Sequence, residues 1–161
     1  MATEQTGRGV PPFTAFNFEV MLSIDGVTDR DPACGAAFAE CDGLEMTLEP
    51  KTIREGGRNT GPVHLAGGLS YGQLTLKRGM TNSFDLWNWF EKMSQDGQTG
   101  YRTSAVIIMY GADQSEQAVF NLTGCLPLKL KAPALNAKEG LIAIEEMQIA
   151  YESLQLSPPE E

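Results

Sequence analysis

A strict alternation of apolar and other side chains near the start of the chain is the feature that most constrains its fold. Apolar residues stand at every second position from Phe16 to Ile24, and the turn pair Asp25-Gly26 ends the run. A period of two places one face of a β-strand in a core and leaves the other face polar. Further strand patterns follow over residues 36–49, 73–78, 103–110, 118–131 and 141–154. The chain is therefore expected to consist mainly of β-strands.

One helix interrupts this pattern, over residues 82–96. Leu86, Trp89, Phe90 and Met93 recur at the spacing of a single helical face, and Gly97 ends the segment. Both tryptophans of the chain lie in this segment, which predicts that the helix packs on a sheet. About seven strands around one helix predict a mainly β fold, an antiparallel β-sandwich or small β-barrel with one α-helix.

Residues 50–71 break the alternation. Glycines and Pro62 punctuate this stretch, which also holds charged residues and His64, the only histidine of the chain. Because the alternation stops, we expect a long loop here. Loops of roughly twenty residues inside a small domain are usually functional or disordered, so the alternatives are a contact with a partner and a solvated, mobile loop. The expected domain organisation is a flexible N-terminal arm (1–12), a single β domain (13–156) and a loose C-terminal tail (157–161).

The chain is acidic, with 12 basic and 21 acidic residues and a net charge of −9. Such a surface is unsuited to gripping a phosphate backbone or an anionic membrane, so neither sequence-specific nucleic-acid binding nor membrane anchoring is expected. The charge is uneven, because residues 51–102 carry seven basic and four acidic side chains between two acidic segments. This layout favours self-association. Because the first residues hold no apolar signal segment, we expect synthesis in the cytosol.

No pattern in the chain is typical of an active site. His64 would have to serve any catalytic triad, yet it stands alone in the glycine-rich stretch. Glu145 and Glu146 would point to opposite faces of a strand, so we expect solvated or interface roles for them rather than a shared substrate. Three cysteines without a C-x-x-C spacing favour free thiols over a disulfide or a zinc site. We expect no catalytic residue, no metal and no cofactor.

Two segments carry a more specific signal. Ile53-Arg54-Glu55-Gly56-Gly57-Arg58-Asn59 is followed by Tyr71-Gly72-Gln73-Leu74-Thr75-Leu76-Lys77-Arg78-Gly79, which leads into the helix that bears Trp87 and Trp89. Cys41-Asp42-Gly43-Leu44-Glu45-Met46 precedes them, and a closing strand pattern at 142–152 follows. This order resembles the T4-like tail tube proteins of contractile phages and the inner tube proteins of related contractile injection systems. The resemblance covers most of residues 13–156.

The resemblance implies a structural subunit without catalysis. In that family, subunits join their sheets edge to edge into hexameric rings, and the rings stack into a hollow tube. The implied partners are further copies of the chain, a contractile sheath, baseplate and cap proteins, and protein or DNA cargo in the lumen. The implied location is an assembled phage tail or injection particle, after synthesis in the bacterial cytoplasm.

Charged residues and glycines of the two motifs are the expected contacts between subunits. Charged side chains would pair across the boundary, and glycines would permit close approach of two backbones. These residues are Arg54, Glu55, Gly56, Gly57, Arg58, Asn59, Lys77 and Arg78. We expect Arg54→Ala or Glu55→Ala to leave the subunit folded but to block polymerisation, as judged by electron microscopy. Normal tubes from both variants would remove residues 50–71 from the interface.

Polar residues on the strand faces away from the core are expected to line the lumen. They are Glu19, Glu45, Thr47, Gln73 and Thr75. A polar, acidic wall would let cargo slide without adhesion, and an outer face against the sheath would show the same pattern in the sequence. The alternative to a tube subunit is a monomeric β-sandwich that binds a glycan or peptide through residues 50–71. A small hydrolase is disfavoured because His, Cys and converging carboxylates are scarce.

Overall fold

The computed structural model of the chain describes residues 13, 17–24, 34–36, 38–57, 60–95 and 103–159. The predicted N-terminal arm, 1–12, and the last two residues of the predicted tail lie outside the described residues. The described part contains ten strands and one helix. They are β1 (Phe18–Ile24), β2 (Cys34–Ala36), β3 (Glu40–Asp42), β4 (Met46–Ile53), β5 (Val63–Tyr71), β6 (Gln73–Gly79), α1 (Asp85–Gln95), β7 (Thr103–Tyr110), β8 (Glu116–Lys131), β9 (Ile144–Ala150) and β10 (Ser153–Ser157).

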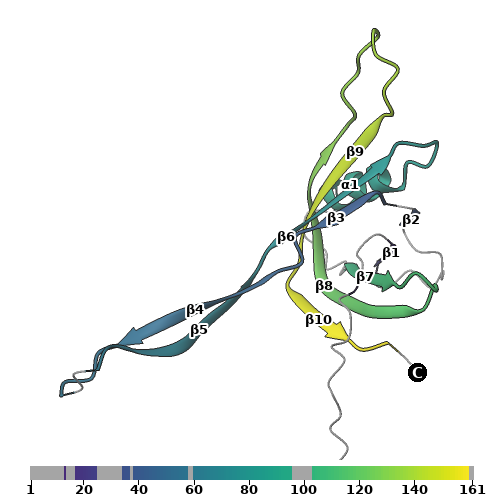
Figure 1. Ribbon diagram of the computed structural model, residues 1–161. Coiled ribbons are helices and arrows are strands. Elements are labelled where there is room, and N and C mark those ends of the chain that lie inside the picture. Colours follow the sequence, from purple (N-terminus) through teal and green to yellow (C-terminus); the bar gives the residue numbers. More distant parts are fainter. Residues whose placement is uncertain are drawn as a thin grey trace, which may run out of the picture.

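Eight of these strands form one antiparallel sheet that folds into two layers. The strand order is β2-β1-β7-β8-β9-β6-β3, and β10 pairs with β8 beside this path. The antiparallel β-rich fold with one helix is confirmed (Figure 1). The strand patterns over 73–78, 103–110 and 118–131 correspond to β6, β7 and β8.

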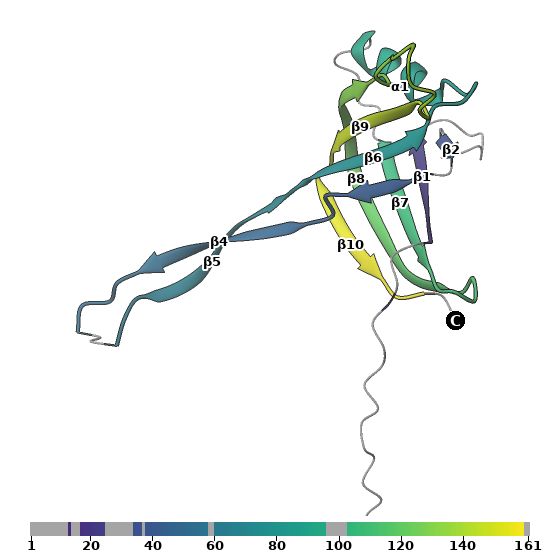
Figure 2. The ribbon, with the colours of Figure 1, turned by 45° about the horizontal axis from the view of Figure 1, so that its top comes forward.

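The long strand β8 joins the two layers. Its residues 116–125 pair with β7, and its residues 126–131 pair with β9. The backbone of Gly124 has a φ of +63°, and a Cβ at this position would lie 2.5 Å from the carboxyl carbon of Glu152. Only glycine fits such a site without strain, so Gly124 permits β8 to pass from one layer to the other (Figure 2).

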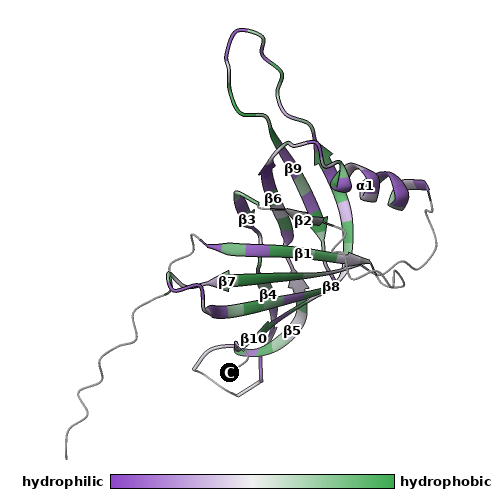
Figure 3. Cartoon of the chain, turned by 90° about the vertical axis from the view of Figure 1, so that its right-hand side faces the viewer, coloured by the Kyte–Doolittle hydropathy of each residue, from purple (hydrophilic) through white to green (hydrophobic). Residues whose placement is uncertain are grey.

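The core lies between the two layers and follows the predicted alternation. Val20 and Leu22 of β1 face Leu74 and Leu76 of β6 in one buried cluster, which Met147 and others complete. The strand β7 is hydrophobic along most of its length, as its colour in Figure 3 shows. Burying a large aliphatic side chain contributes about 1.5–3 kcal/mol, so this cluster is the main source of stability.

The helix α1 covers one end of the sandwich with its apolar face. Leu86 and Trp89 are buried, and Phe90 and Met93 pack against the same core while partly exposed. The predicted apolar stripe is therefore confirmed, although the described helix begins at Asp85 rather than at 82. Phe84, just before it, remains exposed.

The prediction of a loop over residues 50–71 is wrong. These residues belong largely to a β-hairpin in which β4 pairs with β5 from Met46↔Tyr71 to Ile53↔Val63, and only 54–62 connect the strands. The hairpin projects away from the body (Figures 1 and 2). Neither face of it lies on a core, so the residues need no apolar alternation, and hydrogen bonds between the two strands hold them in place. That is why a search for periodicity missed them.

Two further segments differ from the sequence prediction. The pattern over 141–154 is two strands, β9 and β10, separated at Tyr151 and Glu152, and residues 132–143 form a long connection without strand pairing. The expected break at Asp42-Gly43 is confirmed, since Gly43 has a φ of +96° and a Cβ there would lie 1.8 Å from the carbonyl oxygen of Gln73. This break separates β3, in the body, from β4, in the hairpin.

Candidate functional site

The projecting hairpin exposes large apolar side chains that the chain itself does not cover. Five of them are between 45% and 59% exposed: Met46, Leu48, Ile53, Leu65 and Leu69. Every residue of β4 is exposed. Exposed apolar side chains that gather on one element mark a surface that another molecule covers. We call the hairpin strands β4 and β5 with these side chains the hairpin surface.

The apolar side chains change faces along the hairpin. Leu48 pairs with Leu69, but beyond the register shift Lys51 pairs with Leu65 and Ile53 with Val63. Because alternate residues of β4 point to opposite faces, Leu48 and Ile53 lie on opposite sides. A Cβ at Gly67 would lie 2.2 Å from the carbonyl oxygen of Glu49, so glycine is required at the shift. The hairpin surface is therefore two-sided.

A tyrosine braces the base of the hairpin. The hydroxyl of Tyr151 donates to the carbonyl oxygen of Gly43 at 2.7 Å and accepts from the backbone N–H of Glu45 at 3.1 Å. Its ring lies 5.7 Å from that of Tyr71, at the end of β5. These contacts hold both hairpin strands against the body, so the hairpin leaves the body in a defined direction.

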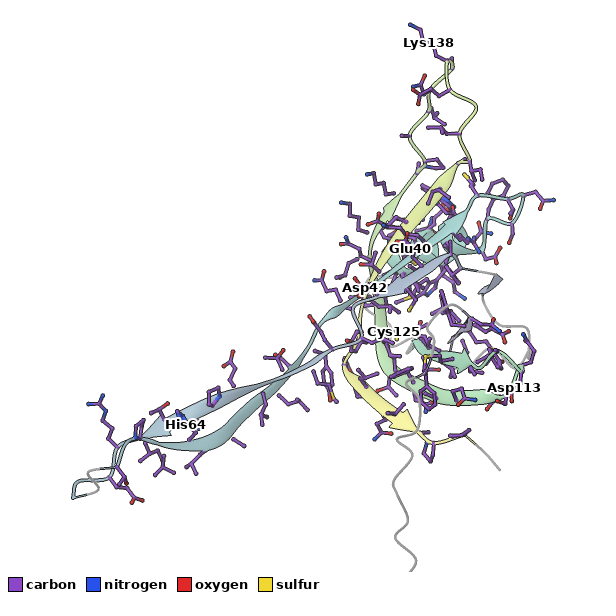
Figure 4. The ribbon with its side chains drawn as sticks, in the orientation of Figure 1. Glu40, Asp42, His64, Asp113, Cys125 and Lys138 are labelled. Carbon is purple, nitrogen blue, oxygen red and sulfur yellow. The ribbon has the colours of Figure 1, made fainter. Side chains whose placement is uncertain are left out.

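The predicted contact residues of the first motif lie at the far end of this hairpin. Arg54, Glu55, Gly56 and Gly57 are all exposed there, while Arg58 and Asn59 lie outside the described residues. His64 is also exposed, on β5, and its Nδ1 lies 3.4 Å from the hydroxyl of Thr52 (Figure 4). The contact of these residues with a neighbouring subunit stays a prediction.

Arg78 is buried within its own subunit rather than at its surface. The side chain is 2% exposed, and its Nε donates to Oε1 of Glu145 at 2.5 Å, where Glu145 is 1% exposed. Nε1 of Trp87 donates to the other carboxylate oxygen at 2.9 Å. Arg78 therefore does not serve the predicted contact between subunits, and Glu145 does not have the solvated role expected for it. Charged residues such as Arg78 and Glu145 are normally exposed, so their types do not predict burial. Their pairing depends on β6 and β9 lying side by side, which the sequence alone does not show.

This buried pair also holds the helix. Nη2 of Arg78 donates to the carbonyl oxygen of Ser83 at 3.4 Å, Nη1 lies 4.0 Å from Oδ2 of Asp85, and the guanidinium lies 5.7 Å from the ring centre of Phe38. Two strands, the start of α1 and the segment before β3 are thus joined through one guanidinium group. A group bonded on this many sides stabilises one arrangement of these elements.

Lys77 lies on the opposite face of β6, pointing away from the core. Its Nζ lies 3.0 Å from Oε2 of Glu40 on β3, and the hydrogen bond with Glu40, together with its negative charge, raises the pKa of Lys77. The paired residue on β9 is Glu146, which is half-buried on the same outward face. This polar face of β3, β6, β9 and residues 126–131 of β8 is called the outer face below.

The five predicted lumen residues do not share one face. Gln73 and Thr75 lie on the outer face beside Lys77. Glu19 lies on β1 in the other layer, where its Oε2 accepts from the hydroxyl of Tyr110 at 3.0 Å. Glu45 and Thr47 lie at the base of the hairpin. Which of these residues line a lumen stays a prediction.

A second projection was missed by the sequence reasoning. The connection between β8 and β9 exposes Leu135 by 93% and Ile142 by 81%, with Leu141 nearby, and Lys138 lies at its tip (Figure 4). The sequence does hold a signal for this projection. Large apolar residues stand close to Pro133 and Asn136, two residue types that end strands. Together with the hairpin surface, it gives the subunit two uncovered apolar extensions.

One cavity, of about 420 Å³, lies among residues of β1, β3, β7 and β8. Its lining includes Phe18, Ile107, Met109 and Phe120 together with Glu40, Cys41 and Asp42. Among the described residues, no cluster of three His, Cys, Asp or Glu side chains is placed to hold a metal ion. The helix that the structure describes is too short and too polar to cross a membrane.

The two cysteines with described side chains are free thiols, as expected for them. Burial raises the pKa of Cys41 and of Cys125 to about 11, and the nearby charge of Asp42 contributes at Cys41. At pH 8 the thiolate fraction is then about one in a thousand, roughly 100-fold below that of an ordinary thiol. In a Cys34→Ser variant we expect both thiols to react about 100-fold more slowly with Ellman's reagent than in the unfolded chain. Equal rates would contradict the burial of these thiols.

A family model and several solved structures both match this chain over most of its length. The family model described as T4-like virus tail tube protein gp19 matches residues 14–155. A search of curated protein sequences found no significant match. Among solved structures, a chain of the anti-feeding prophage (AFP) baseplate, symmetrised six-fold, is 24% identical with a TM-score of 0.80, covering 93% of this chain and 98% of that one.

Two other structures are similar. A chain of the anti-feeding prophage tube-terminating cap is 18% identical with a TM-score of 0.75, covering 98% of this chain and 99% of that one. A chain of the sheath–tube complex of an extracellular contractile injection system (PVC), in the extended state, is 17% identical with a TM-score of 0.73, covering 91% and 92%. At these identities the likeness concerns the fold.

Proposed function

This chain belongs to the family of T4-like virus tail tube proteins and is a structural subunit of the inner tube of a contractile injection apparatus, and on that premise we propose that its subunits join as hexameric rings that stack into a hollow conduit. The observation that carries the mode of assembly is the hairpin surface, which leaves five large apolar side chains uncovered on a rigidly braced projection. A monomeric binding module is not favoured, because the family consists of tube proteins.

We place the hairpin surface against a neighbouring copy of the chain. Its two apolar faces would each be covered, one by a copy in the same ring and one by a copy in the next ring. The exposed charges at its far end, Arg54 and Glu55, would then pair with oppositely charged residues of one of these copies. Burying a fully exposed Leu or Ile contributes about 1.5–3 kcal/mol, and these side chains are about half-exposed, so each would contribute about half of that and the five together would still favour association.

The subunit would act without catalysis, as part of the wall of a channel along which cargo passes. The outer face is polar, with Gln73, Thr75 and Gln148 between charged residues of both signs, and it would line the bore. A polar wall gives cargo no large apolar surface to bind. The sheath, baseplate and cap proteins would contact the other surfaces of the tube within an assembled particle, after synthesis in the cytoplasm.

The purified chain tests this proposal directly. We expect sedimentation velocity to show species several times heavier than 17.5 kDa, and negative-stain images to show rings or rods with a central bore. The same measurements at high concentration would contradict the proposal if they showed only a 17.5 kDa monomer.

A further inference from the structure

The hairpin continues the two-stranded ribbon that β3 and β6 form in the body. The pairing of β3 with β6 reaches Asp42↔Thr75, and the pairing of β4 with β5 begins at Met46↔Tyr71. Both strands have the same number of residues between these two pairs, so the register continues across the interruption. We call these residues, 43–45 and 72–74, the hairpin base. The ribbon leaves the sheet at this point (Figure 2).

Regular strand pairing is interrupted at the hairpin base. A backbone hydrogen bond joins its two segments, from the N–H of Gly72 to the carbonyl oxygen of Glu45 at 3.2 Å. The carbonyl oxygen of Gly43 and the N–H of Glu45 bond to a side chain instead. A two-stranded ribbon is only marginally stable by itself, and an interruption of its pairing is the place where it would bend. The direction of the hairpin therefore depends on that side chain.

The side chain is Tyr151, whose hydroxyl replaces a pairing strand at the hairpin base. The hydroxyl donates to Gly43 at 2.7 Å, accepts from the N–H of Glu45 at 3.1 Å, and has the carbonyl oxygen of Glu45 at 3.1 Å as well. A phenol both donates and accepts, so one hydroxyl satisfies backbone groups of both kinds. Its ring lies 5.7 Å from that of Tyr71, the last residue of β5. One side chain thus contacts both strands of the hairpin.

Tyr151 is itself held firmly by the body. It is 6% exposed and lies between β9 and β10, where the chain passes from one layer to the other. The preceding residue, Ala150, pairs with Gln73, and the N–H of the following residue, Glu152, donates to the carbonyl oxygen of Thr123 at 2.8 Å. The hydroxyl therefore has a fixed position from which it can orient the hairpin.

A small rotation at the hairpin base would move the far end of the hairpin by a large distance. The strand β4 has eight residues, and at about 3.3 Å per residue it extends about 26 Å. A rotation of about 15° would then displace its far end by about 7 Å, which exceeds the spacing of about 4.8 Å between neighbouring strands. A binding partner shaped for one direction of the hairpin would not fit another.

We propose that Tyr151 is a positioning residue for assembly, whose hydroxyl fixes the direction of the hairpin and so prepares the hairpin surface to bind a neighbouring copy of the chain. The inference rests on the proposed function and adds to it the group that sets this direction. A hairpin that moves freely loses that freedom on binding, which weakens association, whereas a hairpin that is already fixed does not. Tyr151 would therefore raise the affinity between copies while buried within its own subunit.

The variant Tyr151→Phe removes only the hydroxyl and tests this role. We expect the concentration needed for half-assembly, measured by sedimentation velocity, to rise about tenfold. Tubes formed above that concentration should have the natural diameter, because the hairpin surface is unchanged. The matched control is Tyr110→Phe, which removes a hydroxyl bonded to Glu19 at 3.0 Å in the other layer. The control should shift half-assembly less than twofold, and circular dichroism establishes that both variants are folded.

The direction of the hairpin is measured separately, in the single chain at a concentration below assembly. Nitroxide labels are attached at Thr52→Cys on β4 and Gln155→Cys on β10, both exposed positions, in the Cys34→Ser chain. The two remaining thiols react slowly because burial raises their pKa to about 11. Double electron–electron resonance then gives the distribution of distances between the labels. We expect one narrow distribution with Tyr151 in place, and a distribution at least twice as wide in Tyr151→Phe.

The outcomes separate this inference from the proposed function. An equally narrow distribution in Tyr151→Phe would overturn it, and so would a wide distribution combined with natural half-assembly. Equal shifts of half-assembly in Tyr151→Phe and Tyr110→Phe would also overturn it. If Tyr151→Phe does not fold, Tyr71→Leu removes the ring contact on the β5 side, and an unchanged distribution in that variant overturns the inference. Failure of the natural chain to assemble at any concentration would count against the proposed function, while the distances would still decide whether Tyr151 fixes the hairpin.

Discussion

Replacement of Glu145 by glutamine is expected to lower the free energy of unfolding by about 3–5 kcal/mol. The variant keeps the shape of the side chain but removes the negative charge that faces Arg78. Arg78 is 2% exposed and would stay buried after losing the carboxylate that its Nε contacts, and Asp85, at 4.0 Å, only partly replaces that carboxylate. Chemical denaturation at a concentration where the chain is monomeric measures this difference.

The adjacent glutamate supplies the control for this experiment. Glu146 lies on the outer face, and Glu146→Gln should change the free energy of unfolding by less than about 1 kcal/mol. A double-mutant cycle with Arg78→Met isolates the pair, because it separates the interaction between the two side chains from the effect of each substitution alone. Equal stability of Glu145→Gln and Glu146→Gln would contradict the view that the buried pair ties the helix to the sheet.

The variant Leu48→Asp/Leu69→Asp is expected to abolish tubes while leaving the subunit folded. These paired leucines lie on the same face of the hairpin and are exposed in the single chain, so the free energy of unfolding should change by less than about 1 kcal/mol. In an assembly they would be buried, and two unpaired carboxylates there would lower the association constant at least 100-fold. Sedimentation velocity and electron microscopy measure the loss.

Leu156→Asp is the matched control for the hairpin variant. Leu156 is as exposed as the hairpin leucines but lies on β10 in the body. We expect tubes from this variant at nearly the natural concentration. Deletion of the hairpin also tests whether assembly needs it. In the shortened chain Asn-Gly joins Thr47 to Ser70, because these two residues are directly opposite and a two-residue turn connects such a pair. Tubes from the double aspartate variant would remove the hairpin surface from the assembly.

The sequence predicted those elements whose side chains meet a core. The strands β6, β7 and β8 and the stripe of Leu86 and Trp89 follow from periodicity, because burial on one face requires it. The hairpin was missed for the converse reason, as both of its faces are uncovered in the single chain. The two strands of 141–154 were read as one, because the residues at their junction, Tyr151 and Glu152, interrupt the pairing without interrupting the composition.

The candidate site was predicted less well than the fold. The motif residues Arg54 and Glu55 do lie on an exposed projection, but Arg78 beside Lys77 is buried. Alternation along β6 shows that Lys77 and Arg78 face opposite sides, yet it does not tell which side is the core for a charged pair.

A cryo-electron microscopy map of the assembled chain tests the central claim most directly. The claim is that this chain forms stacked hollow rings in which neighbouring copies cover the hairpin surface. The map should show a central bore, with β4 and β5 of each subunit packed against neighbouring copies. A solid filament, or rings in which the hairpin surface stays exposed to solvent, would contradict it.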